Sequence, residues 1–214
     1  MTESVKSGPS APAGHGQART RLARRAVIGA ARDLFLQRGY AATTIDAISA
    51  GSDVPVATVY RLFGSKLGIL KTLVDTSISG DDEPEAVPDR PAVASVFAET
   101  DPARLLGRVA AVTTAINQRS NDVYRVLVSA AGSDPAAAGL LGAIREQRDR
   151  GQSQVVRALV RTGSLRDGLP ESDAADVIHA VMSPEVYRLL VIDRGWPPGR
   201  YQDWLAATLR QQLT

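Results

Sequence analysis

Hydroxyl and basic side chains gather between Thr58 and Lys66, in the stretch TVYRLFGSK. Hydroxyl groups and the cations of Arg and Lys are the side-chain groups that most often hydrogen-bond to phosphate oxygens. Directly before this stretch, Val56 and Ala57 cannot make such bonds but suit contact with thymine methyl groups. The residue types therefore point to contact with nucleic acid.

The residues around this stretch have the pattern of two short helices joined by a tight turn. Ile45 and Ile48 share one helical face, residues 51–53 (Gly-Ser-Asp) are turn formers, and Pro55 suits the first turn of a second helix. The apolar positions of the second helix that face back toward the first are Val59, Leu62 and Phe63. This spacing predicts a helix-turn-helix, whose second helix can lie in the DNA major groove.

The stretch from Thr58 to Lys66 resembles the TetR family of transcriptional regulators, whose members carry T-V-Y-x-x-F-x-S-K at this place. The resemblance covers about residues 20–75 with specific motifs and the remainder only loosely. It implies an all-α fold. An N-terminal three-helix helix-turn-helix domain (residues 19–64) would be followed by a C-terminal helical effector-binding and dimerisation domain (residues 65–214).

Two positions depart from the family pattern. Across the turn the family usually has Ala-Gly-Val, and this chain has Ser52, Asp53 and Val54. Asp53 therefore takes the usual Gly position, and Asp tolerates the left-handed backbone conformation better than most residues. Pro55 replaces a usual Ser, which removes a hydroxyl that could contact phosphate. We expect the fold to be kept and the DNA contacts to differ.

The resemblance also implies roles for single residues. Thr44 and Lys66 match phosphate-contacting positions, and Thr58 and Tyr60 carry hydroxyls suited to phosphate, although Tyr60 could instead be core. Arg61 could read guanine or hold a phosphate. An arginine cluster near residue 24 opposes the helix dipole, which a DNA backbone or a merely solvated helix end would explain. The predicted DNA-binding residues are Arg24, Thr44, Val56, Ala57, Thr58, Tyr60, Arg61 and Lys66.

Composition and charge agree with this division. The chain has 214 residues and no Cys, which excludes disulfides and thiolate chemistry. It shows no signal peptide and no apolar run long enough to cross a membrane, so we expect a cytoplasmic protein. Residues 1–80 hold 10 Lys/Arg and 5 Asp/Glu, a balance of +5, whereas residues 81–214 hold 15 and 18, a balance of −3. A basic front half fits a nucleic-acid-binding region.

Helical patterns continue along the chain. Residues 1–18 should be a disordered tail and residues 80–91 a loop or linker. We expect the helix that contains Pro184 to be kinked there. The expected helices span residues 20–38, 45–50, 55–63, 65–79, 101–118, 121–131, 134–161, 171–194 and 200–212.

The last two expected helices carry apolar stripes that something must cover. Packing inside the same subunit is one explanation. The family resemblance implies another, a four-helix bundle formed with a second copy, and we predict this homodimer. The predicted interface residues are Val177, Val181, Tyr201, Trp204, Leu205, Thr208 and Leu209.

No enzymatic motif is present. The sequence has no G-x-S-x-G, no P-loop and no G-x-G-x-x-G, and its His residues, His15 and His179, have no metal-ligand spacing around them. We therefore predict no enzyme, no catalytic residue, no metal and no cofactor. The resemblance implies an effector pocket in the C-terminal half, where Tyr124, His179 and Tyr187 are candidate lining residues or ordinary core.

Taken together, the sequence predicts a sequence-specific DNA-binding transcriptional regulator. We expect a repressor that a small-molecule effector releases from a near-palindromic operator. The alternative is a ligand-independent DNA-binding activator or architectural protein. The expected partners are double-stranded operator DNA, a second copy of the chain and the effector, with no membrane.

Overall fold

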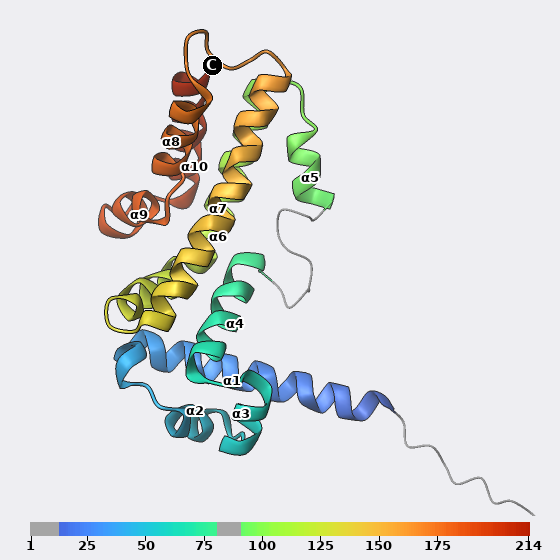
Figure 1. Ribbon diagram of the computed structural model, residues 1–214, viewed down its shortest axis with the longest axis vertical. Helices are drawn as coiled ribbons and strands as arrows, with labels where there is room; N and C mark the ends of the chain where they lie inside the picture. The colour runs from blue at the N-terminus through green and yellow to red at the C-terminus, as the bar shows by residue number, and fades with distance from the viewer. Residues whose placement is uncertain (1–12, 81–90) are drawn as a thin grey trace, which may run out of the picture.

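The computed structural model describes residues 13–80 and 91–214, and every regular element in these two ranges is a helix (Figure 1). The predicted all-α fold is confirmed. None of the described helices is long and apolar enough to span a membrane. In chain order the helices are α1 (Ala13–Ala42), α2 (Ile45–Ser52), α3 (Val56–Phe63), α4 (Lys66–Ser79), α5 (Pro91–Phe97), α6 (Pro102–Ala131), α7 (Pro135–Arg161), α8 (Glu171–Val181), α9 (Pro184–Tyr187), the π-helical segment η2 (Arg188–Asp193) and α10 (Pro198–Leu213).

The helices α1, α2 and α3 form the lower end of the molecule, and α4 rises from them toward the rest of the chain (Figure 1). Gly39 breaks α1 with a φ of 78°, directly after residue 38, where the first expected helix ends. Phe35, Ile48 and Val59 bring one fully buried side chain from each of α1, α2 and α3 into a common core. The predicted helix-turn-helix is therefore a packed unit.

Two clusters of buried apolar side chains fill the molecule. The first joins α1–α4 to the adjoining ends of α6 and α7, and it includes Leu127 and Leu141. The second lies among α5, the far ends of α6 and α7, and α8–α10, and it includes Leu106 and Leu159. Because the long helices α6 and α7 contribute to both clusters, they connect the helix-turn-helix end to the carboxy-terminal helices.

Three expectations along the chain need correction. The helix α1 begins at Ala13, so residues 13–18 are helical rather than disordered, while residues 1–12 of the expected tail and residues 81–90 of the expected linker lie outside the described residues. The helix α5 was not expected. The expected helices 101–118 and 121–131 are one continuous helix, α6. There, Ser120 donates its hydroxyl hydrogen to the Ile116 carbonyl, and Asn121 binds the Pro184 carbonyl instead of competing for its own backbone.

Pro184 ends a helix rather than kinking one. The helix α8 stops at Val181, and Ser183 takes an extended ψ of 148°, as a residue before proline prefers. Pro184 then occupies the first turn of α9, and the Ser183 hydroxyl accepts a hydrogen bond from the Val186 amide at 3.1 Å. The missing N–H of proline is not needed at this position. The expected single helix over residues 171–194 is thus three segments.

The apolar stripe of α10 is largely covered within the subunit. Tyr201, Leu205 and Leu209 are fully buried, with α10 packed against α6 and α8. Their predicted place in a dimer interface is wrong, because a side chain already covered by its own subunit has no surface left for a second copy. The other predicted interface residues, Val177, Val181, Trp204 and Thr208, remain half-buried.

Candidate functional site

Local hydrogen bonds set the turn between α2 and α3. Thr44 caps α2, its hydroxyl oxygen accepting from the Ala47 amide at 3.1 Å. Asp53 takes the left-handed conformation, with φ 54° and ψ 29°, so it does replace the usual glycine of this turn. Ser49 on α2 donates to the Val54 carbonyl at 2.7 Å and fixes the chain just before α3 begins. The turn is held although neither residue 53 nor residue 55 follows the family pattern.

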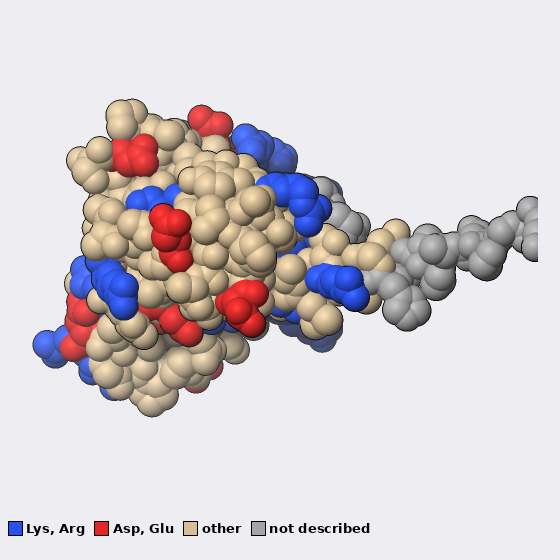
Figure 2. Space-filling view, turned by 90° about the horizontal axis from the view of Figure 1, so that it is seen from below, with Lys and Arg blue, Asp and Glu red and all other residues tan. Residues whose placement is uncertain are grey.

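The recognition helix α3 presents a small outer face. Ala57, Tyr60 and Arg61 are exposed, and Tyr60 keeps half of its surface in solvent, which argues against a core role. Val56 and Thr58 are half-buried beside them. Figure 2, which views this end from below, shows Lys and Arg side chains with Asp and Glu side chains among them rather than an unbroken basic surface.

Lys66 lies at an internal joint. Its ammonium donates to the Tyr40 carbonyl at 2.8 Å and to the Thr43 carbonyl at 2.9 Å, and it sits 4.3 Å from the centre of the Tyr40 ring. Burial lowers the pKa of Lys66, and the Asp134 carboxylate acts in the opposite direction. The expectation that Lys66 projects toward a phosphate needs correction, because the ammonium joins the start of α4 to the end of α1.

Arg24 has a comparable internal role. Its guanidinium donates to the Leu62 carbonyl at 3.1 Å and lies 4.8 Å from the centre of the Phe63 ring. The cation therefore satisfies a carbonyl in the last turn of α3, where the helix dipole favours positive charge. Arg24 holds the recognition helix against α1, which corrects its expected role as a phosphate ligand.

A cavity of about 190 Å³ lies in the carboxy-terminal part, between α6 and α7. Its wall is mostly apolar and draws on both hydrophobic clusters: Tyr124 belongs to the first, and Val109 and Met182 belong to the second. Ile78, near the end of α4, also lines it. The polar residues of the wall are Thr113, Asn117, Ser120, Tyr124, Arg145, Gln147, Arg148 and Gln152.

Only one of the predicted pocket residues lines this cavity. Tyr124 does, and its hydroxyl bonds to the Glu185 carboxylate at 3.2 Å. His179 is exposed on α8 instead, bound to Asp149 at 2.9 Å. Tyr187 is buried in the second cluster, edge-on to Tyr201 with ring centres 5.0 Å apart. The predicted places of His179 and Tyr187 in the pocket are therefore wrong.

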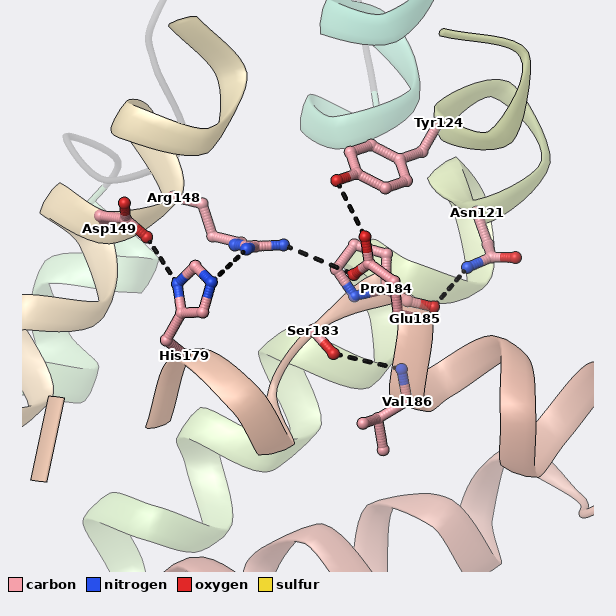
Figure 3. Close-up of polar contacts among 9 residues, drawn as sticks. All are labelled: Asn121, Tyr124, Arg148, Asp149, His179, Ser183, Pro184, Glu185 and Val186. Atoms are coloured by element: carbon pink, nitrogen blue, oxygen red, sulfur yellow. Dashed lines mark hydrogen bonds and ion pairs between the residues drawn. The ribbon is translucent and has the colours of Figure 1, made fainter. Parts of the chain in front are cut away.

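A chain of polar contacts runs along one side of the cavity (Figure 3). The Arg148 guanidinium contacts the His179 Nε2 at 3.2 Å, and its other terminal nitrogen lies 3.9 Å from the Glu185 carboxylate. Figure 3 shows Tyr124 reaching the same Glu185 carboxylate from above. These polar contacts involve residues of α6, α7, α8 and α9, so they connect the segment between α8 and α9 to the cavity wall.

A helix-turn-helix joined to a larger helical region with a cavity is an architecture of DNA-binding regulators. Residues 27–73 match the family model described as bacterial regulatory proteins, tetR family. The uncharacterized HTH-type transcriptional regulator YdeS of Bacillus subtilis (strain 168) is 27% identical over 179 residues, which cover 82% of each chain.

Solved structures share the fold over nearly the whole chain. NalD of Pseudomonas aeruginosa, the secondary repressor of the MexAB-OprM multidrug efflux pump, has a TM-score of 0.70 at 16% identity and covers 91% of this chain and 98% of its own. FadR of Bacillus subtilis, in complex with stearoyl-CoA, has a TM-score of 0.69 at 15% identity, over 89% and 99% of the two chains. Residues 27–73 thus form a DNA-binding domain of the TetR family, and over most of its length the chain resembles DNA-binding transcriptional regulators, which are not enzymes.

Several residues that shape these sites were not predicted. Tyr40 and Thr43 supply the carbonyls that hold Lys66, and Asn117, Arg148 and Gln152 supply polar groups of the cavity wall. The polar residues of the wall do carry a sequence signal: Arg148 and Gln152 are four residues apart, between the apolar positions Ile144 and Val155 of the same helical face. A polar pair on an apolar face is unexpected in a simple core.

Proposed function

We propose that the chain acts as a homodimeric repressor that leaves a near-palindromic operator when a small molecule fills the cavity. The observation that carries this proposal is the position of α4. Ile78 near its carboxy-terminal end lines the cavity, and Lys66 at its first turn is bonded to the end of α1. One helix of 14 residues, about 21 Å long, therefore touches the cavity at one end and the DNA-binding unit at the other.

The cavity is also placed where filling it would change packing. Side chains from both hydrophobic clusters line the cavity, so a bound ligand would contact both clusters and could change how they pack against each other. The Ile78 carbonyl is further held by the Arg119 side chain of α6, at 3.0 Å. A ligand acts on DNA affinity only if it binds the operator-competent and released states with different affinity. Movement of α4 against α6 would supply that difference.

For the DNA contacts, we propose that α3 enters the major groove. Ala57 and Val56 would contact thymine methyl groups, Thr58 and Tyr60 would bind phosphate, and Arg61 would read guanine. Thr44 would add a phosphate contact from the start of α2, where the first helical amides favour an anion. The internal bonds of Lys66 and Arg24 keep these elements in register without themselves being part of the contact surface.

For the dimer, we propose a surface made by α8, η2 and α10. Leu189 and Ile192 on η2 expose about half of their surface (48% and 49%). Val177 and Val181 on α8 and Trp204 on α10 are half-buried. Exposed apolar side chains of this kind favour an interface with another chain. A two-fold dimer would place two recognition helices on half-sites about one DNA turn apart or somewhat more, ~34–36 Å.

Selection of random duplex DNA on the purified protein tests the proposal. Retained sequences should form a near-palindrome, and the affinity of the best duplex should fall when the cavity is filled. In the same assay Arg61→Ala should relax preference at one base position, at a cost of ~1–3 kcal/mol, if Arg61 reads guanine. A uniform loss would make Arg61 a phosphate contact. A tightly bound cavity ligand that leaves DNA affinity unchanged would refute the coupling.

A further inference from the structure

We infer that the cavity binds a small apolar molecule with one anionic head group, and that Arg148 recognises the head group. This inference rests on the proposed function, since it names the class of effector. The first observation is the charge of the wall. Among the residues that the structure describes, the wall contains Arg145 and Arg148 but no Asp or Glu, and the remaining surface is mostly apolar. An anion with an apolar body matches both features.

The second observation is that buried polar atoms of the wall have no partner. Asn117 and Gln152 are 4% and 8% exposed, and the Asn117 Nδ2 and the Gln152 Oε1 make no hydrogen bond. The Arg148 Nε is also buried without a partner. Buried polar groups are normally paired, and an unpaired one is costly, so the two unpaired donors, the Asn117 Nδ2 and the Arg148 Nε, indicate an acceptor atom of a ligand nearby.

The contacts of Arg148 leave a defined part of its guanidinium for the ligand. The His179 Nδ1 donates to Asp149, so the Nε2 of the neutral ring accepts the N–H of the Arg148 Nη2. The Arg148 Nη1 lies 3.9 Å from Glu185, a carboxylate that is half-exposed and also receives the Tyr124 hydroxyl. Figure 3 shows these partners on the side of the terminal nitrogens. The Nε remains for a carboxylate oxygen.

The polar atoms also lie on facing helices. Arg148 and Gln152 occupy successive turns of α7, and Asn117 and Ser120 do so on α6. A head group between them could accept from the Arg148 Nε and the Asn117 amide, while its chain follows the apolar wall formed by Val109, Val112, Ile116, Val155 and Met182. The volume of about 190 Å³ suits a short chain, since an apolar cavity of ~150 Å³ already holds benzene.

The experiment uses the full-length protein and three probes with the same apolar body: octanoate, octanol and octylammonium. Binding is measured by calorimetry and by the shift in Tm. Octanoate should bind most tightly, octanol less, and octylammonium not at all. In Arg148→Gln, octanoate affinity should fall at least about tenfold and approach that of octanol. Arg157→Gln, an exposed arginine on the same helix, should bind octanoate as the wild type does.

A second pair of variants tests the place of binding. Gly151 lines the cavity with open space where a side chain would begin, so Gly151→Leu should fill the cavity and abolish binding of octanoate and octanol. Gly139 on the same helix is also open but lies outside the cavity, so Gly139→Leu should leave binding unchanged.

The inference is overturned if octylammonium binds as tightly as octanoate, if octanoate fails to bind, or if its affinity survives Arg148→Gln or Gly151→Leu. These outcomes are separate from failure of the proposed function. Octanoate binding that meets every expectation without changing DNA affinity would refute the repressor mechanism alone, and selection of a near-palindrome without octanoate binding would refute the ligand class alone.

Discussion

At the joint between α1 and α4, the Lys66 ammonium has two carbonyl oxygens within hydrogen-bonding distance, whereas in the cavity the Arg148 Nε and the Asn117 Nδ2 have no partner. The contrast extends to the two regions as a whole. Among the described residues, the buried side-chain nitrogen and oxygen atoms that make no hydrogen bond are all on α6, α7 and α10.

The difference shows how each region uses polar side chains. In α1–α4 the internal cations satisfy carbonyls at helix ends, which fixes the angle between short helices that could not be stable alone. Around the cavity, polar groups are buried but left unpaired, a state that costs stability unless a ligand completes it. We expect the first region to resist change in its packing and the second to gain stability from a bound molecule.

The largest effect that would test the rigid packing of α1–α4 is expected from Gly68→Ala. A methyl group at this position would lie 2.0 Å from the Phe63 carbonyl oxygen, a backbone atom that cannot turn aside. The free energy of unfolding should fall by about 3 kcal/mol. Gly29→Ala is the matched control, because Gly29 is helical with nothing within 4 Å, and it should be neutral or stabilising. Chemical denaturation measures both, and equal effects would contradict the close approach.

The next effect concerns the carboxy-terminal core and depends on pH. Burial raises the pKa of Tyr201 to about 12, with Asn117 acting in the opposite direction. An unfolded tyrosine titrates near pH ~10. Tyr201 therefore keeps its proton to a higher pH in the folded state than in the unfolded state. The resulting stability is present below pH 10 and is lost between pH 10 and 12, and it is on the order of 2–3 kcal/mol.

Tyr201→Phe isolates this contribution. The variant should have about the stability of the wild type at neutral pH, because the buried hydroxyl has no partner within hydrogen-bonding distance and only a weaker interaction with the Asn117 side chain. It should lose less stability than the wild type between pH 10 and 12. Burial also raises the pKa values of Tyr40 and Tyr187. The wild type and the variant should therefore both lose some stability at alkaline pH. Parallel stability curves for the two proteins would show that Tyr201 does not supply the difference.

A smaller effect is expected from Lys66→Ala. The variant leaves the Tyr40 and Thr43 carbonyls without their cation, and stability should fall by about 2 kcal/mol. Below its melting temperature it should bind DNA with an unchanged salt dependence, whereas loss of a phosphate contact would lower the slope by about one unit. Lys71→Ala, which removes only an exposed pair with Asp75, should be nearly neutral. A lower salt slope of DNA binding for Lys66→Ala would show that Lys66 contacts a DNA phosphate.

The sequence predicted the helix-turn-helix well because its signals are local. The Thr44 and Ser65 caps, the left-handed Asp53 and the break at Gly39 each depend on a residue and its immediate neighbours. The signals failed where a distant partner decides the outcome. Asn121 continues a helix because the Pro184 carbonyl, far along the chain, takes its amide. The break expected at residues 119–120 therefore does not occur.

The site predictions divide along the same line. The exposure of Tyr60 and Arg61 agrees with their expected positions on the outer face of α3, while Lys66 turned inward because the carbonyls at the end of α1 lie within reach. The periodicity of α10 correctly predicted an apolar face. It could not distinguish a second subunit from α6 as the covering surface, because both would bury the same stripe.

The smallest predicted effect concerns two helix caps within α1–α4. Thr44 caps α2 and Ser65 caps α4, each through a hydroxyl oxygen that accepts an amide, at 3.1 Å and 3.0 Å. Thr44→Ala and Ser65→Ala should each cost about 1 kcal/mol of stability. Only Thr44 is proposed to donate its hydroxyl hydrogen to a phosphate, so only Thr44→Ala should also weaken DNA binding, uniformly across sequences. Binding titrations at a temperature where both variants are folded make the comparison. Equal DNA affinities would restrict Thr44 to its capping role and leave α3 as the element that contacts DNA.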